Sequence, residues 1–556
     1  MKHKLTYYIG AALMLMSISS CNLDINQDPN AVTKLDMSQL LTATEYEVGY
    51  TFSEGNYLNA NFSSYVHHTV SREVDNYSLI PSYATLGNTW SQAYRYAIKN
   101  CDKVIAEGDA AGNTYYAGIG RVLRTHIYLA MTDLWGDIPY SEANVEGKET
   151  PKADSSEAIY NDLLASINTA IANFKDTEAA NALLPGSNDL FYQGNIEKWL
   201  KAANTMKLKI LVQSRKAKGK VTGWDAELAA VLAENNFIGD GEDLQFPHSS
   251  AIAPMDERKP GFIDEYEGSQ KSVFISPWLF EVMNGRTTNF KSNPFSGIKD
   301  PRTNYYYVNQ LTADDDASNP VDYRDGAFVS IMFGSNSGKT SYTQEKSMTV
   351  VGIYPVGGKY DDGKGGAVGP KSGNGIAPDK MLQAYSVPFM LAELALAGEH
   401  TGDASALLKE GILASIYHVN AVSTASSATV PTISDAAAGE FADAVLAKFE
   451  AADSEGKMEI LMTQKWVANF YNPVEAYNDI RRTGYPEIFK GDGDGYAYSP
   501  YTQTVESVSG LTKYDLVSLL DFPRVLSYPL GETSVNPNIT NEGRVLSERH
   551  VFWDVQ

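Results

Sequence analysis

Apolar residues recur at steps of three and four along two long regions of the chain, and this spacing constrains its fold more than any other feature. Such steps place side chains on one face of an α-helix, whereas a strand alternates at every second residue. Each stripe therefore predicts an amphipathic helix. The four stripes of the first region are Trp90, Tyr94, Ala97, Cys101 and Val104; Ile119, Leu123, Ile127, Ala130 and Leu134; Ile159, Leu163, Ile167, Ala170 and Phe174; and Trp199, Ala203, Met206 and Ile210.

Residues near the ends of these stripes predict where the helices begin and end. Gly108 follows the first stripe and is expected to stop that helix. Asp154 and Glu157 precede the third stripe at the spacing of a capping box. Trp90 lies on the apolar stripe, so we assign it to the core rather than to a binding surface.

The second helical region lies toward the C-terminus. Ser386 followed by Pro388 resembles an N-cap with a proline in the first turn. A second helix is expected over 403–418, and a third is marked by Ile460, Thr463, Val467 and Phe470. Helix pairs joined by short turns resemble tetratricopeptide packing, although no regular 34-residue repeat is present. The fold class is therefore mainly α.

Between and after the helical regions the composition changes. Residues 236–379 are rich in Gly, Pro, Asn, Asp and Tyr, and the tail over 491–556 is similar. Long non-helical segments are often functional in compact proteins. We therefore expect a helical scaffold over about 85–235 and 380–490, with a loop-rich face formed by the other two segments.

The first 35 residues predict export and anchoring. Two lysines, an apolar run over 5–18 and small residues up to position 20 have the order of a secretory signal. The apolar run would make a helix of about 21 Å, too short for about 30 Å of hydrocarbon. Cys21 after a small residue resembles a bacterial lipobox, so we expect residues 1–20 to be removed, Cys21 to carry lipid and 21–35 to form a tether. Cys21→Ser should then release the protein from membranes.

The net charge argues against nucleic-acid binding, and the cysteine count argues against an internal disulfide. The formal charge is −23, and loss of Lys2 and Lys4 with the signal takes the mature chain of 536 residues to −25. Such acidity disfavours nucleic acid as a partner. Lipidation of Cys21 would leave Cys101 as the one remaining cysteine, so an internal disulfide is excluded.

Tyrosine is abundant, with 34 residues, and several tyrosines lie in the expected loops. A flat ring stacks on the apolar face of a sugar, and it also suits a peptide; alternatively, loop tyrosines cover the helices beneath with their hydroxyls in water. Tyr305 and Tyr307 would share one face if 304–308 is extended. The candidate ligand-binding residues are Tyr77, Tyr83, Trp278, Tyr305, Tyr307 and Tyr354.

No motif of a known catalytic type occurs in the sequence. G-x-S-x-G, H-E-x-x-H and the P-loop are all missing. Carboxylates are plentiful, but nothing singles out a glycosidase pair. The adjacent histidines of "VHH" (66–68) suit a core or solvated pair better than a metal site. We expect no metal and no cofactor; calcium at "DGDGY" (492–496) or "DDD" (314–316) is the weaker alternative, because neither matches EF-hand spacing.

Four motifs carry a resemblance to a known family. They are "CNLDINQDPN" (21–30), "LWGDIPYSEA" (134–143), "NDIRRTGYP" (478–486) and "RVLSYPLGETSVNPNI" (524–539). In this order and spacing the chain resembles the SusD-like (SusD/RagB) outer-membrane lipoproteins of Bacteroidetes-type bacteria. The "DPN" and "RRTGYP" sequences look most like the second SusD-like subgroup.

The resemblance implies one helical domain over 36–556 with tetratricopeptide-like helix pairs. It implies a lipid-anchored protein on the outer membrane, facing the cell exterior, that acts as a ligand-capturing lid over a SusC-like TonB-dependent transporter. Family ligands are usually oligosaccharides and in some members peptides, and the family binds without hydrolysing. A glycan-degrading enzyme is the third reading. Trp135 and Arg481–Arg482 are expected to maintain the fold or contact a partner.

Overall fold

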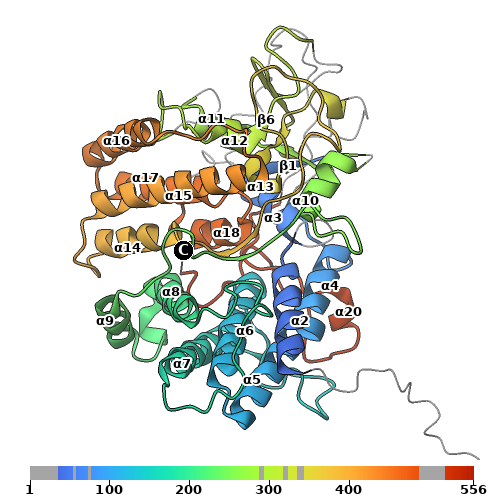
Figure 1. Ribbon diagram of the computed structural model, residues 1–556, viewed down its shortest axis with the longest axis vertical. Coiled ribbons are helices and arrows are strands. Elements are labelled where there is room, and N and C mark those ends of the chain that lie inside the picture. The colour runs from blue at the N-terminus through green and yellow to red at the C-terminus, as the bar shows by residue number, and fades with distance from the viewer. Residues whose placement is uncertain are drawn as a thin grey trace, which may run out of the picture.

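The computed structural model describes residues 36–53, 58–72, 77–268, 270–286, 293–316, 323–334, 344–486 and 520–555. Helices dominate these residues and strands are short, so the predicted mainly α class is confirmed. Figure 1 shows two groups of helices, one in the lower half and one in the upper left, with a region of loops and short strands at the upper right.

The lower group contains the four helices that the first apolar stripes predict. The first stripe spans a continuous helical run in which a π-helical segment, η2, joins α4 to α5. A preceding helix, α2, was not predicted and packs against η2, α5 and α6. The elements are α2(Met37–Tyr50), α4(Ala84–Ser91), η2(Gln92–Ile98), α5(Lys99–Ala111), α6(Thr114–Trp135), α7(Ser156–Lys175), α8(Ile196–Ser214), η3(Arg215–Lys220) and α9(Trp224–Glu234).

The upper group is built from antiparallel neighbours that are close in sequence. α14 packs on α15 and α17, and α15 packs on α16. The last helix of the group, α18, contacts α3 and α6 and so touches the lower half (Figure 1). The elements are α14(Ser386–Leu396), α15(Ala404–Ser426), α16(Asp435–Ala451), α17(Ser454–Ala468) and α18(Pro473–Thr483).

Three predicted helix ends are wrong. The first helical run passes Gly108 and ends at Gly112, which adopts the left-handed conformation (φ 67°). Gly108 instead faces α6, where an added Cβ would lie 2.8 Å from the Ala117 amide nitrogen. The third helix is capped by Ser155 rather than by an Asp154 box. In α14 the N-cap position belongs to Tyr385, not Ser386.

The strands of the described residues form antiparallel ladders of two strands each, most of them in the loop-rich region. β1 pairs with β5 through Thr69↔Ile275, and β6 pairs with β9 through Tyr307↔Val351. The ladder of β4 and β10 connects this region to α2, which β4 contacts. The strands are β1(Thr69–Ser71), β2(Ile138–Pro139), β3(Ala153–Asp154), β4(Leu244–Phe246), β5(Val273–Ile275), β6(Tyr307–Val308), β7(Tyr323–Asp325), β8(Phe328–Ser330), β9(Val350–Val351) and β10(Asp379–Leu382).

Short helices complete the described structure. Most of them lie in the loop-rich region and are one or two turns long. They are α3(Leu58–Tyr65), α10(Pro260–Phe262), η4(Ile263–Glu267), α11(Pro277–Met283), α12(Thr303–Tyr306), η6(Gln344–Lys346), α13(Ile353–Val356) and α20(Leu530–Thr533).

A buried group of charges holds the two helical groups together. Arg482 of α18 forms an ion pair with Glu393 of α14, and its Nη2 lies 2.7 Å from Asp479. Arg215, at the end of the lower group, lies 3.2 Å from the same Glu393. Burial alone would raise the pKa of Glu393, but the charge and hydrogen bonds of Arg482 outweigh it and lower that pKa. The expected structural role of Arg482 is consistent with this arrangement.

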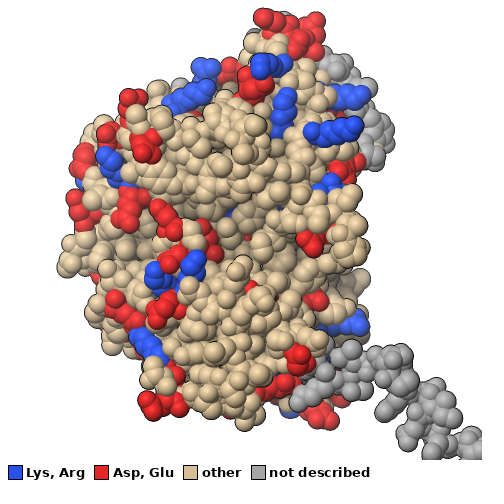
Figure 2. All heavy atoms as spheres, viewed as in Figure 1, with Lys and Arg blue, Asp and Glu red and all other residues tan. Residues whose placement is uncertain are grey.

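The face in Figure 2 carries charged side chains of both signs, mainly toward its edges, with several basic side chains at the upper right and much of the middle uncharged. No helix in the described ranges combines the length and apolar character needed to cross a bilayer.

Candidate functional site

The structure buries five of the six aromatic residues expected to contact ligand. Tyr77 packs against Tyr65 and Phe333, and its hydroxyl lies 2.7 Å from His67 Nε2. Trp278 also packs on His67, with ring centroids 4.5 Å apart. Both aromatic side chains are 1% exposed, so their faces are covered by protein rather than presented to a ligand.

The three tyrosines of the later loops are also buried. The Tyr305 hydroxyl donates to the Pro431 carbonyl (2.5 Å), and the Tyr307 hydroxyl accepts from Asn284 (2.8 Å). Residues 303–306 form the short helix α12 before β6 begins at 307, so the condition under which Tyr305 and Tyr307 would share one face, an extended 304–308, is not met. These tyrosines fill the interior beneath the loops, so their rings are not exposed for a sugar to stack on.

Tyr354 and Tyr83 have different environments. Tyr354 is buried and its hydroxyl lies 2.8 Å from His418 Nδ1. Tyr83 precedes α4 and is 44% exposed, so its ring is available at the surface. A role for Tyr83 in binding stays a prediction.

A cavity of about 920 Å³ lies between α2 and the segment over 246–264. Tyr46 and Tyr50 stand one helical turn apart on α2, and their rings stack with centroids 5.8 Å apart and planes 9° from parallel. Phe246 of β4 contacts Tyr46 edge-on. Tyr46 and Tyr50 are half-buried and line the cavity, so part of the aromatic pair is accessible from it.

Charged groups line the opposite side of this cavity. Arg258 is held in place by Asp256 (2.7 Å) and Glu267 (2.5 Å). Asp264 also lines the cavity, and its burial raises the pKa of that carboxyl. Fixed carboxylate and guanidinium groups opposite aromatic rings can bind hydroxyl groups of a ligand whose apolar face lies on the rings.

A second cavity of about 530 Å³ adjoins the first, because Pro247 and His248 line both. Successive side chains of β4 point to opposite faces, so Gln245 lines the smaller cavity and Phe246 lines the larger one. His248 is fixed by Asp379 (2.8 Å), which also binds Lys259 (2.6 Å). Together the two cavities form what we call the β4 site.

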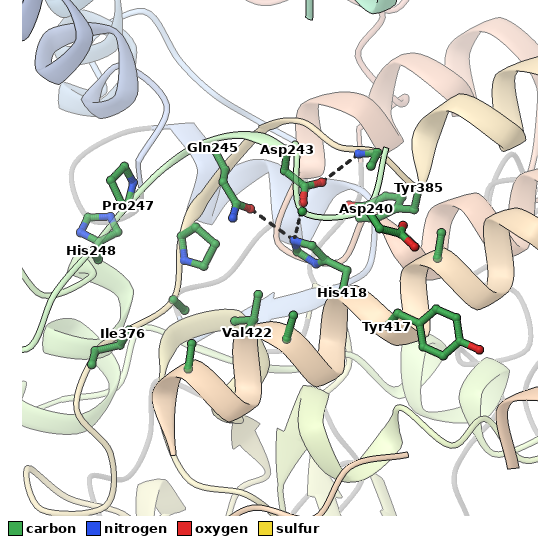
Figure 3. Close-up of a pocket in the computed structure, with 17 residues that line it drawn as sticks. Asp240, Asp243, Gln245, Pro247, His248, Ile376, Tyr385, Tyr417, His418 and Val422 are labelled. Atoms are coloured by element: carbon green, nitrogen blue, oxygen red, sulfur yellow. Dashed lines mark hydrogen bonds and ion pairs between the residues drawn. The ribbon is translucent and has the colours of Figure 1, made fainter. Parts of the chain in front are cut away.

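The smaller cavity is shown in Figure 3. His418 projects from α15 toward Gln245 and Asp243, with its Nε2 3.2 Å from the Gln245 amide oxygen. Burial lowers the pKa of His418 to about 4, against the opposing effect of Asp243. The imidazole is therefore neutral at neutral pH and acts as a hydrogen-bonding part of the cavity floor.

Sequence comparison now identifies the family. A family model described as "Starch-binding associating with outer membrane" matches residues 29–499. The chain belongs to the SusD-like family. The resemblance inferred from the four sequence motifs is thereby confirmed. No curated protein sequence matches the chain.

Solved SusD-like structures share the fold over almost the whole chain. A chitin-binding SusD homologue from Flavobacterium johnsoniae is 18% identical, with a TM-score of 0.66 over 94% of this chain and 99% of that one. A SusD homologue from Bacteroides fragilis is 16% identical, with a TM-score of 0.66 and the same coverage. A SusD/RagB family protein from Bacteroides thetaiotaomicron is 19% identical, with a TM-score of 0.64 over 94% and 99%. At these identities the comparison establishes the fold.

Sequence reasoning missed the aromatic pair of the β4 site. The signal was present in "YEVGY" (46–50), because two tyrosines four residues apart lie on one face of a helix. No apolar stripe was recognised there, so α2 was not predicted and its tyrosines were not considered. Phe246 and Arg258 could not be found at all, since they meet α2 only through the fold.

The histidine and acidic motifs noted in the sequence do not form a metal site within the described ranges. His67 and His68 are a core pair, and burial lowers the pKa of each to about 3. Asp314, Asp315 and Asp316 are exposed, and "DGDGY" (492–496) lies outside the described residues. Among the residues described, no three His, Cys, Asp or Glu side chains are grouped so as to hold a metal ion.

Proposed function

We propose that this SusD-like protein binds oligosaccharides at the cell surface and acts as a lid for a SusC-like TonB-dependent transporter, without altering its ligand. The observation that carries the binding role is the stacked pair of Tyr46 and Tyr50 opposite Arg258 and Asp264 in an open cavity. The chitin-binding name of a solved protein with this fold supports glycan as the ligand class.

Titration against a panel of oligosaccharides, including chitin and starch fragments, tests this role. Replacing both Tyr46 and Tyr50 by Ala should weaken glycan binding about tenfold to hundredfold, by analogy with stacking of bases on aromatic side chains. Tyr96→Ala is the matched control, because Tyr96 is 39% exposed and does not line the β4 site. Tyr83→Ala is a second arm that tests the remaining sequence candidate.

Three outcomes would change the proposal. Unchanged glycan affinity in the double variant would move the site away from α2. Turnover of a bound glycan would overturn the non-enzymatic role. Binding of peptides with no binding of any glycan would favour the peptide-uptake alternative, for which the apolar wall of the smaller cavity is the supporting observation.

Anchoring and partnership are separate parts of the proposal. In this proposal residues 21–35 form a tether between the lipid and α2, whose N-cap is Asp36. Cys21→Ser should move the protein from the membrane fraction to the soluble fraction. Affinity purification of the membrane-bound protein should recover a TonB-dependent transporter, and recovery of none would overturn the lid role.

A further inference from the structure

One wall of the smaller cavity is a row of small apolar side chains on α15. Ala414, Ala421, Val422 and Ala425 recur at steps that place them on the same helical face as His418. The facing wall is apolar as well, formed by Ile376, Ala377, Pro378 and Ala384. Alanine at these positions leaves open a space that larger apolar side chains would fill. Because Ala421 and Ala425 are exposed, the cavity is accessible from solvent.

Two carboxyl groups stand at one end of this apolar space. In Figure 3 Asp240 and Asp243 lie on the side away from Pro247 and His248. Asp243 is held in place because its Oδ1 accepts from the Ala384 amide at 2.8 Å. Asp240 makes no hydrogen bond or ion pair with any residue that the structure describes. Partial burial, together with the nearby Asp243, raises the pKa of Asp240.

No positively charged side chain among the described residues that line the cavity pairs with these carboxyl groups. Neither Lys nor Arg is among the described residues that line it. His418 is 3.8 Å from Asp243, but its lowered pKa of about 4 leaves it neutral at neutral pH. Lys380 is nearby but its Nζ donates to the Phe470 carbonyl (2.6 Å) and lies 4.3 Å from the centre of the Tyr354 ring.

We propose that the smaller cavity binds a primary ammonium group carried on an apolar body, with the ammonium between Asp240 and Asp243 and the apolar body against α15. An opposite charge compensates the carboxyl group of Asp243, whose side chain is 7% exposed, and that of the neighbouring Asp240, which is exposed. The alanine row supplies apolar contact area. An ammonium on an apolar body occurs at the N-terminus of a peptide. An ammonium also occurs on amino sugars, whose ring is more polar.

Binding of 2-phenylethylamine and of its neutral analogue 2-phenylethanol, measured by calorimetry at pH 7, tests the charge requirement. We expect the amine to bind at least about tenfold more tightly, corresponding to about 1.4 kcal/mol. Asp240→Asn should remove this preference, and Ala421→Leu should weaken both ligands by filling the space. Asp435→Asn, an exposed change on α16, is the matched control and should preserve the preference.

Equal affinity for the amine and the alcohol would overturn the proposal, as would an amine preference that persists in Asp240→Asn. Two further pairs of compounds distinguish the source of the ammonium group. Leucinamide binding better than N-acetyl-leucinamide assigns a peptide N-terminus, and a glucosamine oligosaccharide binding better than its N-acetylated form assigns an amino sugar. Repeating the titrations with both Tyr46 and Tyr50 replaced by Ala separates this cavity from the proposed glycan platform, because amine binding should survive there.

Discussion

The helical lower half, over 84–234, and the irregular region over 244–382 both bury many aromatic side chains, but they differ in how much of their buried backbone lies outside helices. In the helical half most backbone groups are satisfied within helices, and the Tyr128 hydroxyl has no hydrogen-bond partner among the described residues. The Tyr94 hydroxyl of the same half donates to the Pro139 carbonyl (2.8 Å), which lies outside the helices. In the irregular region the Tyr266 hydroxyl donates to the Val351 carbonyl (2.7 Å) and accepts from the Lys359 amide (3.0 Å).

This difference gives the buried tyrosines of the loops a structural role. Backbone groups outside helices and long strands need other partners when they are buried. Gln310 serves the same purpose, since its side-chain amide donates to the carbonyls of Glu345 (2.5 Å) and Met348 (2.7 Å). Polar-tipped side chains in the irregular region therefore replace the hydrogen bonds that regular structure supplies elsewhere.

The largest expected effect comes from disrupting the buried group of charges that joins the two helical groups. Arg482→Met should lower the free energy of unfolding by about 3–5 kcal/mol, because the buried Glu393 would keep only Arg215 (3.2 Å) and the buried Asp479 only Lys465 (2.8 Å) as a cationic partner. Urea denaturation followed by circular dichroism measures the change. Lys409→Met is the control, since the pair of Lys409 with Asp443 lies at the surface and should cost less than about 1 kcal/mol. Equal losses in the two variants would contradict the assigned role of Arg482.

The next test compares the same substitution in both regions. Tyr266→Phe should cost about 1–3 kcal/mol, because it leaves the buried Val351 carbonyl and Lys359 amide without a partner. Tyr128→Phe removes a buried hydroxyl that has no partner among the described residues, so its effect should be neutral or stabilising. Thermal unfolding of both variants measures the contrast, and a Tyr128→Phe loss as large as that of Tyr266→Phe would remove the distinction between the regions.

The two regions also differ in how far the sequence predicts them. Helices α5 to α8 follow from apolar spacing because that signal is local, and Trp90 is in the core as expected. Loop tyrosines carry no such signal. The Tyr305 hydroxyl reaches Pro431, 126 residues away, and Tyr46 meets Phe246 across the β4 site. Whether a loop ring is buried or presented depends on these distant contacts, so residue type and loop location could not distinguish the two cases.

The smallest expected effect, at Gly439, is compared with that at Gly108, because both glycines lie inside helices and apolar spacing does not distinguish their roles. Gly108→Ala should cost about 1–3 kcal/mol, because the new Cβ would lie 2.8 Å from the Ala117 amide nitrogen where α5 meets α6. Gly439→Ala on α16 meets no atom within 4 Å and should stabilise the protein by about 0.5–1 kcal/mol, since alanine favours the helix. Thermal denaturation of both variants compares them directly. If Gly108 served only to end the helix, Gly108→Ala would not lower the free energy of unfolding. A destabilised Gly108→Ala beside a stabilised Gly439→Ala therefore identifies close helix packing as the reason for glycine at 108.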